Sequence, residues 1–86
     1  MAARVVVYTT SWCGYCVSAK ALLRKRGIPF DEINVNGDAA KRAHLAEVTG
    51  SYTVPQIFID GKSVGGSDEL HDLDREGELA RLLKAV

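Results

Sequence analysis

The sequence predicts a single α/β domain in which helices flank a four-stranded mixed β-sheet, with the element order βαβαββα. Three observations indicate this fold class. Apolar β-branched runs alternate with segments of helical periodicity, an Asp60-Gly61 pair between two apolar runs is typical of a hairpin, and the chain has only 86 residues. This order packs with one right-handed parallel crossover and one hairpin. We therefore expect residues 1–86 to form one domain.

The first strand and the first helix follow directly from residue type and spacing. The β-branched run over residues 4–9 predicts a strand that is covered on both faces. A short polar loop carrying Cys13 comes next, and residues 15–26 have the three- and four-residue spacing of a helix. The predicted apolar stripe of this helix consists of Cys16, Ala19, Leu22 and Leu23. Gly27 ends the helix, and Pro29 prevents its continuation.

A second strand and helix are predicted in the middle of the chain. Residues 30–35 alternate in polarity, and the turn pair Asn36-Gly37 closes this run. Asp38 is a favourable N-cap for a helix over residues 39–49, which Gly50 ends. The first four elements are therefore βαβα.

The last third of the chain predicts a hairpin and a final helical region. Residues 56–59 and 62–64 flank the Asp60-Gly61 turn and should pair as antiparallel strands. The pair Gly65-Gly66 then ends the sheet. Ser67 or Asp68 can cap the final helical region, which we expect to be interrupted near Gly77.

Charge and hydropathy exclude several classes of partner. Eleven Lys and Arg balance eleven Asp and Glu, so there is no global positive field to attract nucleic acid. The longest apolar stretch, Val5-Val6-Val7, is far shorter than a bilayer span. The start, Met1-Ala2-Ala3-Arg4, does not resemble a secretory signal. We expect a cytoplasmic protein that binds neither nucleic acid nor a membrane.

Cys13 and Cys16 form a C-x-x-C motif where the first strand leads into the first helix. Such a motif beside a βαβ pattern is typical of redox chemistry. Unpaired N–H groups at the helix start stabilise a thiolate at Cys13, and Cys16 lies one turn later within disulfide reach. We interpret Cys13 as the attacking thiol and Cys16 as the resolving thiol. Zinc is disfavoured because a site needs four ligands, and His44 and His71 have no paired spacing.

Three motifs together resemble the glutaredoxin family, and in particular its short bacterial dithiol members. They are YTTSWCGYC at residues 8–16, TVPQIFI at residues 53–59 and GGSDEL at residues 65–70. The resemblance covers about residues 5–83. It implies a thioredoxin-like fold and a glutathione-dependent oxidoreductase that reduces glutathione mixed disulfides and protein disulfides. The glutathione-binding residues that it implies are Tyr15, Arg42, Thr53, Val54, Pro55, Gly66, Ser67 and Asp68.

The resemblance also assigns parts of glutathione to these residues. Val54, before a proline that the family holds in the cis form, would pair its backbone with the cysteinyl part. Ser67 and Asp68 would bind the γ-glutamyl end, because free N–H groups suit its carboxylate and Asp68 suits its ammonium. Tyr15 would line the groove beside the sulfur.

The sequence departs from the family pattern at three positions. Relatives commonly have Lys where this chain has Thr10, and many have Arg where it has Tyr52, which leaves Arg42 as the partner for the glycine carboxylate. Gly14 replaces a proline, as in members that hold a [2Fe–2S] cluster between two protomers. Cys13 would then also be a cluster ligand. We expect a monomer, with two alternatives: a cluster-bridged homodimer and a donor reduced by thioredoxin reductase.

Overall fold

The computed structural model describes residues 3–84, which form four strands and four helices. In chain order the elements are β1 (Val5–Thr9), α1 (Gly14–Lys25), β2 (Asp31–Asn34), α2 (Ala39–Thr49), β3 (Gln56–Ile59), β4 (Lys62–Gly65), α3 (Ser67–Arg75) and α4 (Glu78–Lys84). None of these helices has both the length and the apolar character that crossing a membrane requires.

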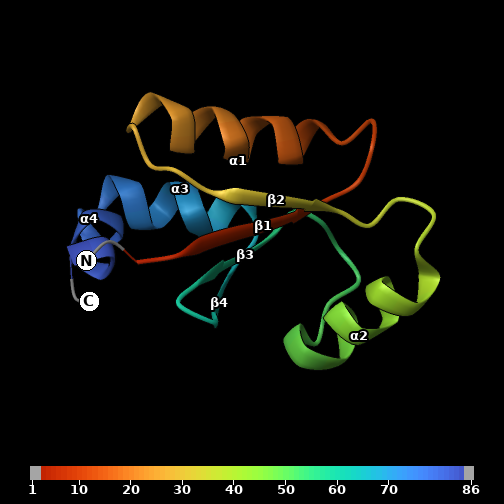
Figure 1. The fold of residues 1–86 in the computed structure, drawn as a ribbon. Helices are drawn as coiled ribbons and strands as arrows, with labels where there is room; N and C mark the ends of the chain where they lie inside the picture. The colour runs from red at the N-terminus through yellow and green to blue at the C-terminus, as the bar shows by residue number, and fades with distance from the viewer. Residues whose placement is uncertain (1–2, 85–86) are drawn as a thin grey trace.

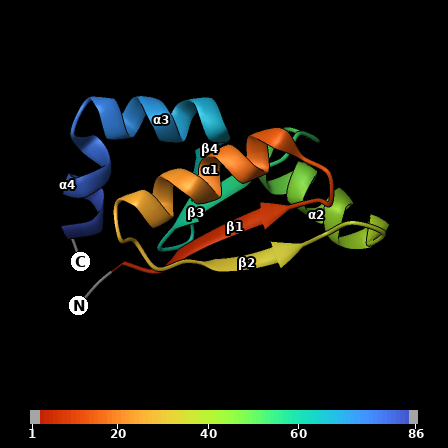
Figure 2. The same cartoon turned by 90° about the horizontal axis from the view of Figure 1, so that it is seen from above.

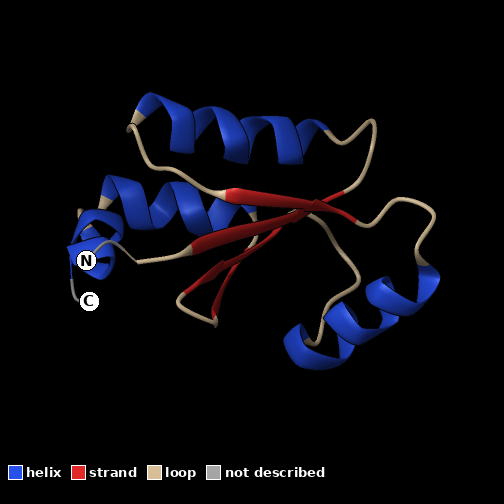
Figure 3. Cartoon of the chain, viewed as in Figure 1, coloured by secondary structure: helices blue, strands red, loops and turns tan. Residues whose placement is uncertain are grey.

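The four strands form one mixed sheet, as the sequence predicts, and their order in it is β2-β1-β3-β4 (Figures 1 and 3). β1 pairs in parallel with β2 and antiparallel with β3, and β3 pairs antiparallel with β4. The hairpin turn has φ values of 50° at Asp60 and 80° at Gly61. Positive φ at both central residues is the geometry that Asp-Gly favours in two-residue hairpins, which explains why this turn could be predicted.

The hydrophobic core lies between one face of the sheet and helices α1 and α3. The four residues of the predicted α1 stripe are the four that α1 buries. From the sheet, every second residue of β1 points into this core, and Leu70 of α3 is fully buried against it. Figure 2, seen from above, shows α1 lying across the sheet with α3 beside it.

The prediction that β1 is covered on both faces is wrong. Val6 and Tyr8, which alternate with the buried residues of β1, are only partly buried. The Tyr8 ring packs edge to face against Phe58 of β3, with 5.5 Å between the ring centroids. Helix α2 does not cover this face, because it lies toward the C-terminal ends of β1 and β2 (Figures 1 and 2).

Two helix starts differ from the prediction by one or two residues. Helix α1 begins at Gly14, with Cys13 as its N-cap, rather than at residue 15. Helix α3 begins at Ser67, and Gly66 rather than Ser67 or Asp68 is the N-cap. Strand β4 also extends through Gly65, which pairs with Ile57 past a register shift. The predicted interruption near Gly77 is confirmed, because α3 and α4 are separate helices there.

Candidate active site

Cys13 lies at the start of α1, where the chain leaves β1. As the N-cap it has an extended backbone, and its Sγ accepts a hydrogen bond from the Cys16 backbone N–H at 3.1 Å. The same Sγ is 3.7 Å from the carbonyl oxygen of Val54. The first turn of a helix has N–H groups without intrahelical partners, so negative charge on this sulfur is stabilised.

Cys16 lies one turn further into α1 and its environment is different. The residue is only 1% exposed, whereas Cys13 is half-buried. Burial, followed by the hydrogen bond with Cys13, raises the pKa of the Cys16 thiol to about 11. At neutral pH Cys16 is therefore a protonated thiol with almost no surface exposed to solvent. Both cysteines are free thiols in the structure.

The turn before Cys13 leaves a large aromatic side chain in solvent. Trp12 has a φ of 62° and is fully exposed, and Tyr15 in the first turn of α1 is also exposed. Positive φ is uncommon for residues other than glycine and occurs often at functional sites. The surface around Cys13 is therefore open and aromatic.

A groove of about 410 Å³ lies beside the cysteines and joins three segments of the chain. Its lining consists of Tyr15, Thr53, Val54, Pro55, Gly66, Ser67, Asp68 and Glu69. The Val54–Pro55 peptide bond in its wall is cis. The structure therefore brings together all the expected glutathione-binding residues except Arg42.

Arg42 lies outside this lining. Its guanidinium donates a hydrogen bond to the Tyr52 carbonyl oxygen at 3.0 Å, which ties α2 to the loop before Val54. The residues that line the groove include no Lys or Arg, and they include the two carboxylates Asp68 and Glu69. The charged groups in the groove are thus acidic and lie in the first turn of α3.

Glu69 is a groove residue that the sequence reasoning missed. Its Oε1 accepts a hydrogen bond from the Gly66 backbone N–H at 2.6 Å, which completes the N-terminal cap of α3. This side chain lies so close to the backbone that a Cβ at Gly65, where φ is 101°, would be 2.8 Å from the Glu69 Cγ. The glycine-x-x-glutamate spacing of a capping box was the available signal.

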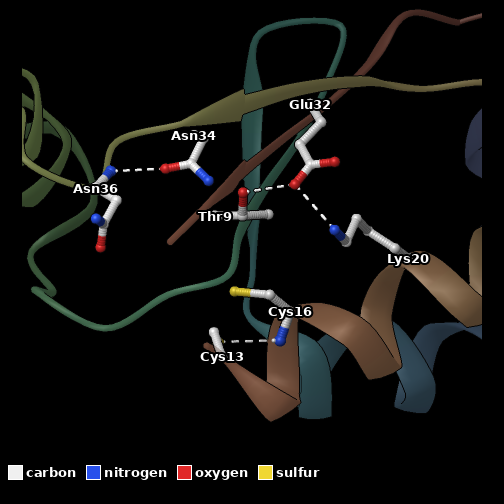
Figure 4. A network of polar contacts seen from close by, with 7 residues as sticks. All are labelled: Thr9, Cys13, Cys16, Lys20, Glu32, Asn34 and Asn36. Atoms are coloured by element: carbon white, nitrogen blue, oxygen red, sulfur yellow. Dashed lines mark hydrogen bonds and ion pairs between the residues drawn. The ribbon is translucent and has the colours of Figure 1, made fainter. Parts of the chain in front are cut away.

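A second missed feature is a polar network on the other side of the cysteines (Figure 4). Glu32 of β2 accepts hydrogen bonds from the Thr9 hydroxyl at 2.7 Å and from the Lys20 ammonium at 2.9 Å. The hydrogen bond from Lys20, and after it the bond from Thr9, hold the pKa of Glu32 below its ordinary value. Lys20 and Glu32 line a cleft of about 330 Å³ together with Cys13 and Cys16.

No three His, Cys, Asp or Glu side chains come together as a metal site within residues 3–84. Within these residues no third side chain of this kind joins Cys13 and Cys16. A [2Fe–2S] cluster would need ligands from a second protomer and from bound thiols.

Comparisons with known proteins agree with this geometry. The model of the Glutaredoxin family matches residues 5–64. A glutaredoxin of Pseudomonas aeruginosa is 53% identical over 81 residues, covering 94% of this chain and 96% of the relative. Glutaredoxin 3 of Escherichia coli strain K12 is 49% identical over 82 residues, covering 95% and 99%. The crystal structure of a buckwheat glutaredoxin–glutathione complex superposes with a TM-score of 0.85 at 33% identity, covering 94% of this chain and 76% of that one.

Proposed function

Because the chain belongs to the glutaredoxin family, we propose that it reduces glutathione mixed disulfides and protein disulfides through Cys13 and Cys16. Membership of this family makes it a glutathione-dependent thiol oxidoreductase with a thioredoxin-like fold. One observation carries the finer proposal. The half-buried Cys13, at the N-terminus of α1, lies beside a groove whose lining includes seven residues expected to bind glutathione.

With a glutathionylated protein, the proposed reaction needs only Cys13. Its thiolate attacks the sulfur of the glutathione moiety, the protein sulfur leaves as a thiol, and Cys13 becomes the Cys13–glutathione mixed disulfide. A second glutathione thiolate then attacks the glutathione sulfur of this bond, which releases glutathione disulfide and returns the Cys13 thiolate. The helix N-terminus stabilises Cys13 both as nucleophile and as leaving group.

With a protein disulfide, the proposed reaction uses both cysteines. Cys13 attacks one sulfur and forms a mixed disulfide with the substrate. Cys16 then attacks the Cys13 Sγ, the Cys13–Cys16 bond forms, and the second substrate thiol is released. Glutathione reduces the Cys13–Cys16 disulfide. The burial of Cys16 supports this order, because a thiol that is only 1% exposed is less accessible to a protein substrate than the half-buried Cys13.

In this proposal glutathione binds along the groove in three parts. The γ-glutamyl carboxylate interacts with the free amides at the start of α3, and Asp68 accepts a hydrogen bond from the γ-glutamyl ammonium. The cysteinyl backbone pairs with Val54. The buckwheat relative was crystallised as a glutathione complex, which supports the same use of this groove. Arg42 would reach the glycine carboxylate only after leaving Tyr52.

We favour this function over the two alternatives. A cluster-bridged homodimer would form only after anaerobic reconstitution with iron, sulfide and glutathione, and it would be brown. A colourless monomer after that treatment would exclude the [2Fe–2S] alternative. A donor reduced by thioredoxin reductase would work with that enzyme in the absence of glutathione. We further propose a cytoplasmic monomer, since the glutathione pool that regenerates it maintains reduced thiols there.

The assignment of roles is tested with single substitutions and two substrates. Cys16→Ser should keep deglutathionylation of a mixed disulfide and lose reduction of a protein disulfide, whereas Cys13→Ser should lose both. Asp68→Asn should raise KM for the glutathione mixed disulfide about tenfold, the size expected for one lost charge-assisted hydrogen bond. Asp72→Asn, on the exposed side of the same helix, is the matched control and should leave KM unchanged. Equal effects of the two Asp substitutions would contradict the proposed groove.

A further inference from the structure

Lys20 is the only cation among the described residues that line the cleft beside the two cysteines, and the reaction proposed above gives it no role. The groove on the other side has no lysine or arginine in its lining. Lys20 is therefore the cation that these two clefts place beside the cysteines.

Lys20 lies on the same face of α1 as Cys16, one turn further along the helix, because the two residues are four apart in the sequence. The Lys20 side chain is only 19% exposed, and its ammonium is held by Glu32 at 2.9 Å. Figure 4 shows the Cys16 sulfur on the side of α1 that faces Thr9, the other residue bonded to Glu32.

Few other charged or titratable groups face Cys16. Cys13 precedes it in the chain, and Glu32 approaches from β2. His71 of α3 meets α1 at Ser18, at 3.5 Å, on a different side of the helix. A hydrogen bond with the Thr10 backbone, and after it the charge of Lys20, oppose the rise in the Cys16 pKa that burial causes. The partly buried ammonium is less screened by solvent than an exposed one, so its field acts over one helical turn.

We propose that Lys20 is a positioning residue for the resolving step, in which its ammonium stabilises the negative charge that Cys16 carries as it attacks Cys13. This inference rests on the roles of Cys13 and Cys16 in the proposed function. In that step the Cys13–Cys16 bond forms and the bond between Cys13 and the substrate sulfur breaks. The electron pair of the broken bond leaves with the substrate sulfur. Cys16 gives up one proton before it attacks, and the departing substrate thiolate takes up one proton, so the step is balanced.

The two steps can be separated by mixing the reduced protein with excess 4,4′-dithiodipyridine, a neutral disulfide. Attack by Cys13 releases one thiopyridone at a rate proportional to the reagent concentration. Resolution by Cys16 releases the second at a rate that does not depend on this concentration. Lys20→Met should slow the second phase about tenfold, the order expected for one partly screened charge at this separation, and change the first phase less than about twofold.

Three further variants distinguish charge from structure. Lys20→Arg should restore the second phase, and Lys25→Met, at an exposed lysine in the last turn of α1, should leave both phases unchanged. Glu32→Gln breaks the ion pair but frees the ammonium, so the second phase should be unchanged or faster. A second phase that is unaffected by Lys20→Met, or that slows equally in Glu32→Gln, would overturn the proposal.

The same experiment separates this inference from the proposed roles of the cysteines. If Cys13 attacks and Cys16 resolves, the Cys16→Ser variant releases a single thiopyridone in the reagent-dependent phase. If that variant still shows both phases, the assignment of the cysteines is wrong, whatever Lys20 does. No glutathione is present, so the result does not depend on the groove.

Discussion

Replacing Gly65 by alanine should destabilise the fold more than a comparable glycine substitution elsewhere, because two effects coincide there. The φ of 101° at Gly65 is unfavourable for a residue with a Cβ, which costs about 1–2 kcal/mol. The added Cβ would also lie 2.8 Å from the Glu69 Cγ and 2.9 Å from the Glu69 Cβ. Rotation of the Glu69 side chain cannot relieve the second contact, so the start of α3 must shift, at about 1–3 kcal/mol.

The net effect follows from these terms and from the unfolded chain. Alanine restricts the unfolded chain more than glycine does, and this raises the free energy of unfolding by about 0.4–1 kcal/mol. We therefore expect Gly65→Ala to lower the free energy of unfolding by about 2–4 kcal/mol. Gly27→Ala is the matched control, because φ there is 68° and nothing lies within 4 Å of the added Cβ. It should cost about 1 kcal/mol.

Urea denaturation followed by circular dichroism measures both values. For a domain of this size each kcal/mol corresponds to about 4–8 °C in Tm, so thermal melts provide an independent check. The Glu69→Ala substitution removes the Cγ and the carboxylate of Glu69. In that background Gly65→Ala should cost about 1 kcal/mol less than it does in the unsubstituted protein. If Gly65→Ala costs no more than Gly27→Ala, the close approach of Glu69 to the backbone is not a feature of the folded protein.

Three further predictions concern the core, the resolving cysteine and the attacking cysteine. Leu23→Ala, at a fully buried position, should cost about 2–5 kcal/mol in urea denaturation, whereas Val48→Ala at an exposed position should cost less than about 0.5 kcal/mol; similar costs would contradict the placement of the core. Folding raises the pKa of Cys16 from 9.0 to about 11, so with rising pH the unfolded chain loses this proton before the folded one does. The free energy of unfolding should therefore fall by roughly 2 kcal/mol as the pH rises from 9.0 to about 11. Denaturation between pH 8 and pH 11 checks this, and an equally steep loss in Cys16→Ser would assign it to other groups. Thr10→Lys places a cation in the cleft beside Cys13 and should speed alkylation of Cys13 by iodoacetamide at pH 6 about threefold or more, with Thr10→Gln as the uncharged control.

Local signals predicted the elements of this chain well. The stripe from Cys16 to Leu23 is read from spacing along a single helix, and the Asp60-Gly61 turn depends on two adjacent residues. Both signals act over a few residues, so no knowledge of distant neighbours is needed. The N-cap of α3 was misplaced because Glu69 reaches back to Gly66 and competes with the capping side chains of Ser67 and Asp68.

The site was predicted partly by physics and partly by resemblance. The C-x-x-C spacing and the helix start at Cys13 identify a reactive thiol on chemical grounds. The groove depends on three separate segments, and only the resemblance to a family associated them before the structure was available. Arg42 shows the limit of this approach, since its hydrogen bond to Tyr52 keeps it outside the groove lining.

The sequence by itself determined the order of the elements, the stripe that α1 buries and the pair of cysteines at a helix start, because spacing and residue type along a short segment are sufficient for each. Only the tertiary structure decided which face of β1 is left partly open, that Glu69 lines the groove, and that Lys20 and Glu32 meet beside the cysteines. Lys20 and Glu32 lie on different elements, one on α1 and one on β2. Their contact depends on how the helix crosses the sheet, and a pattern along the chain does not contain that angle.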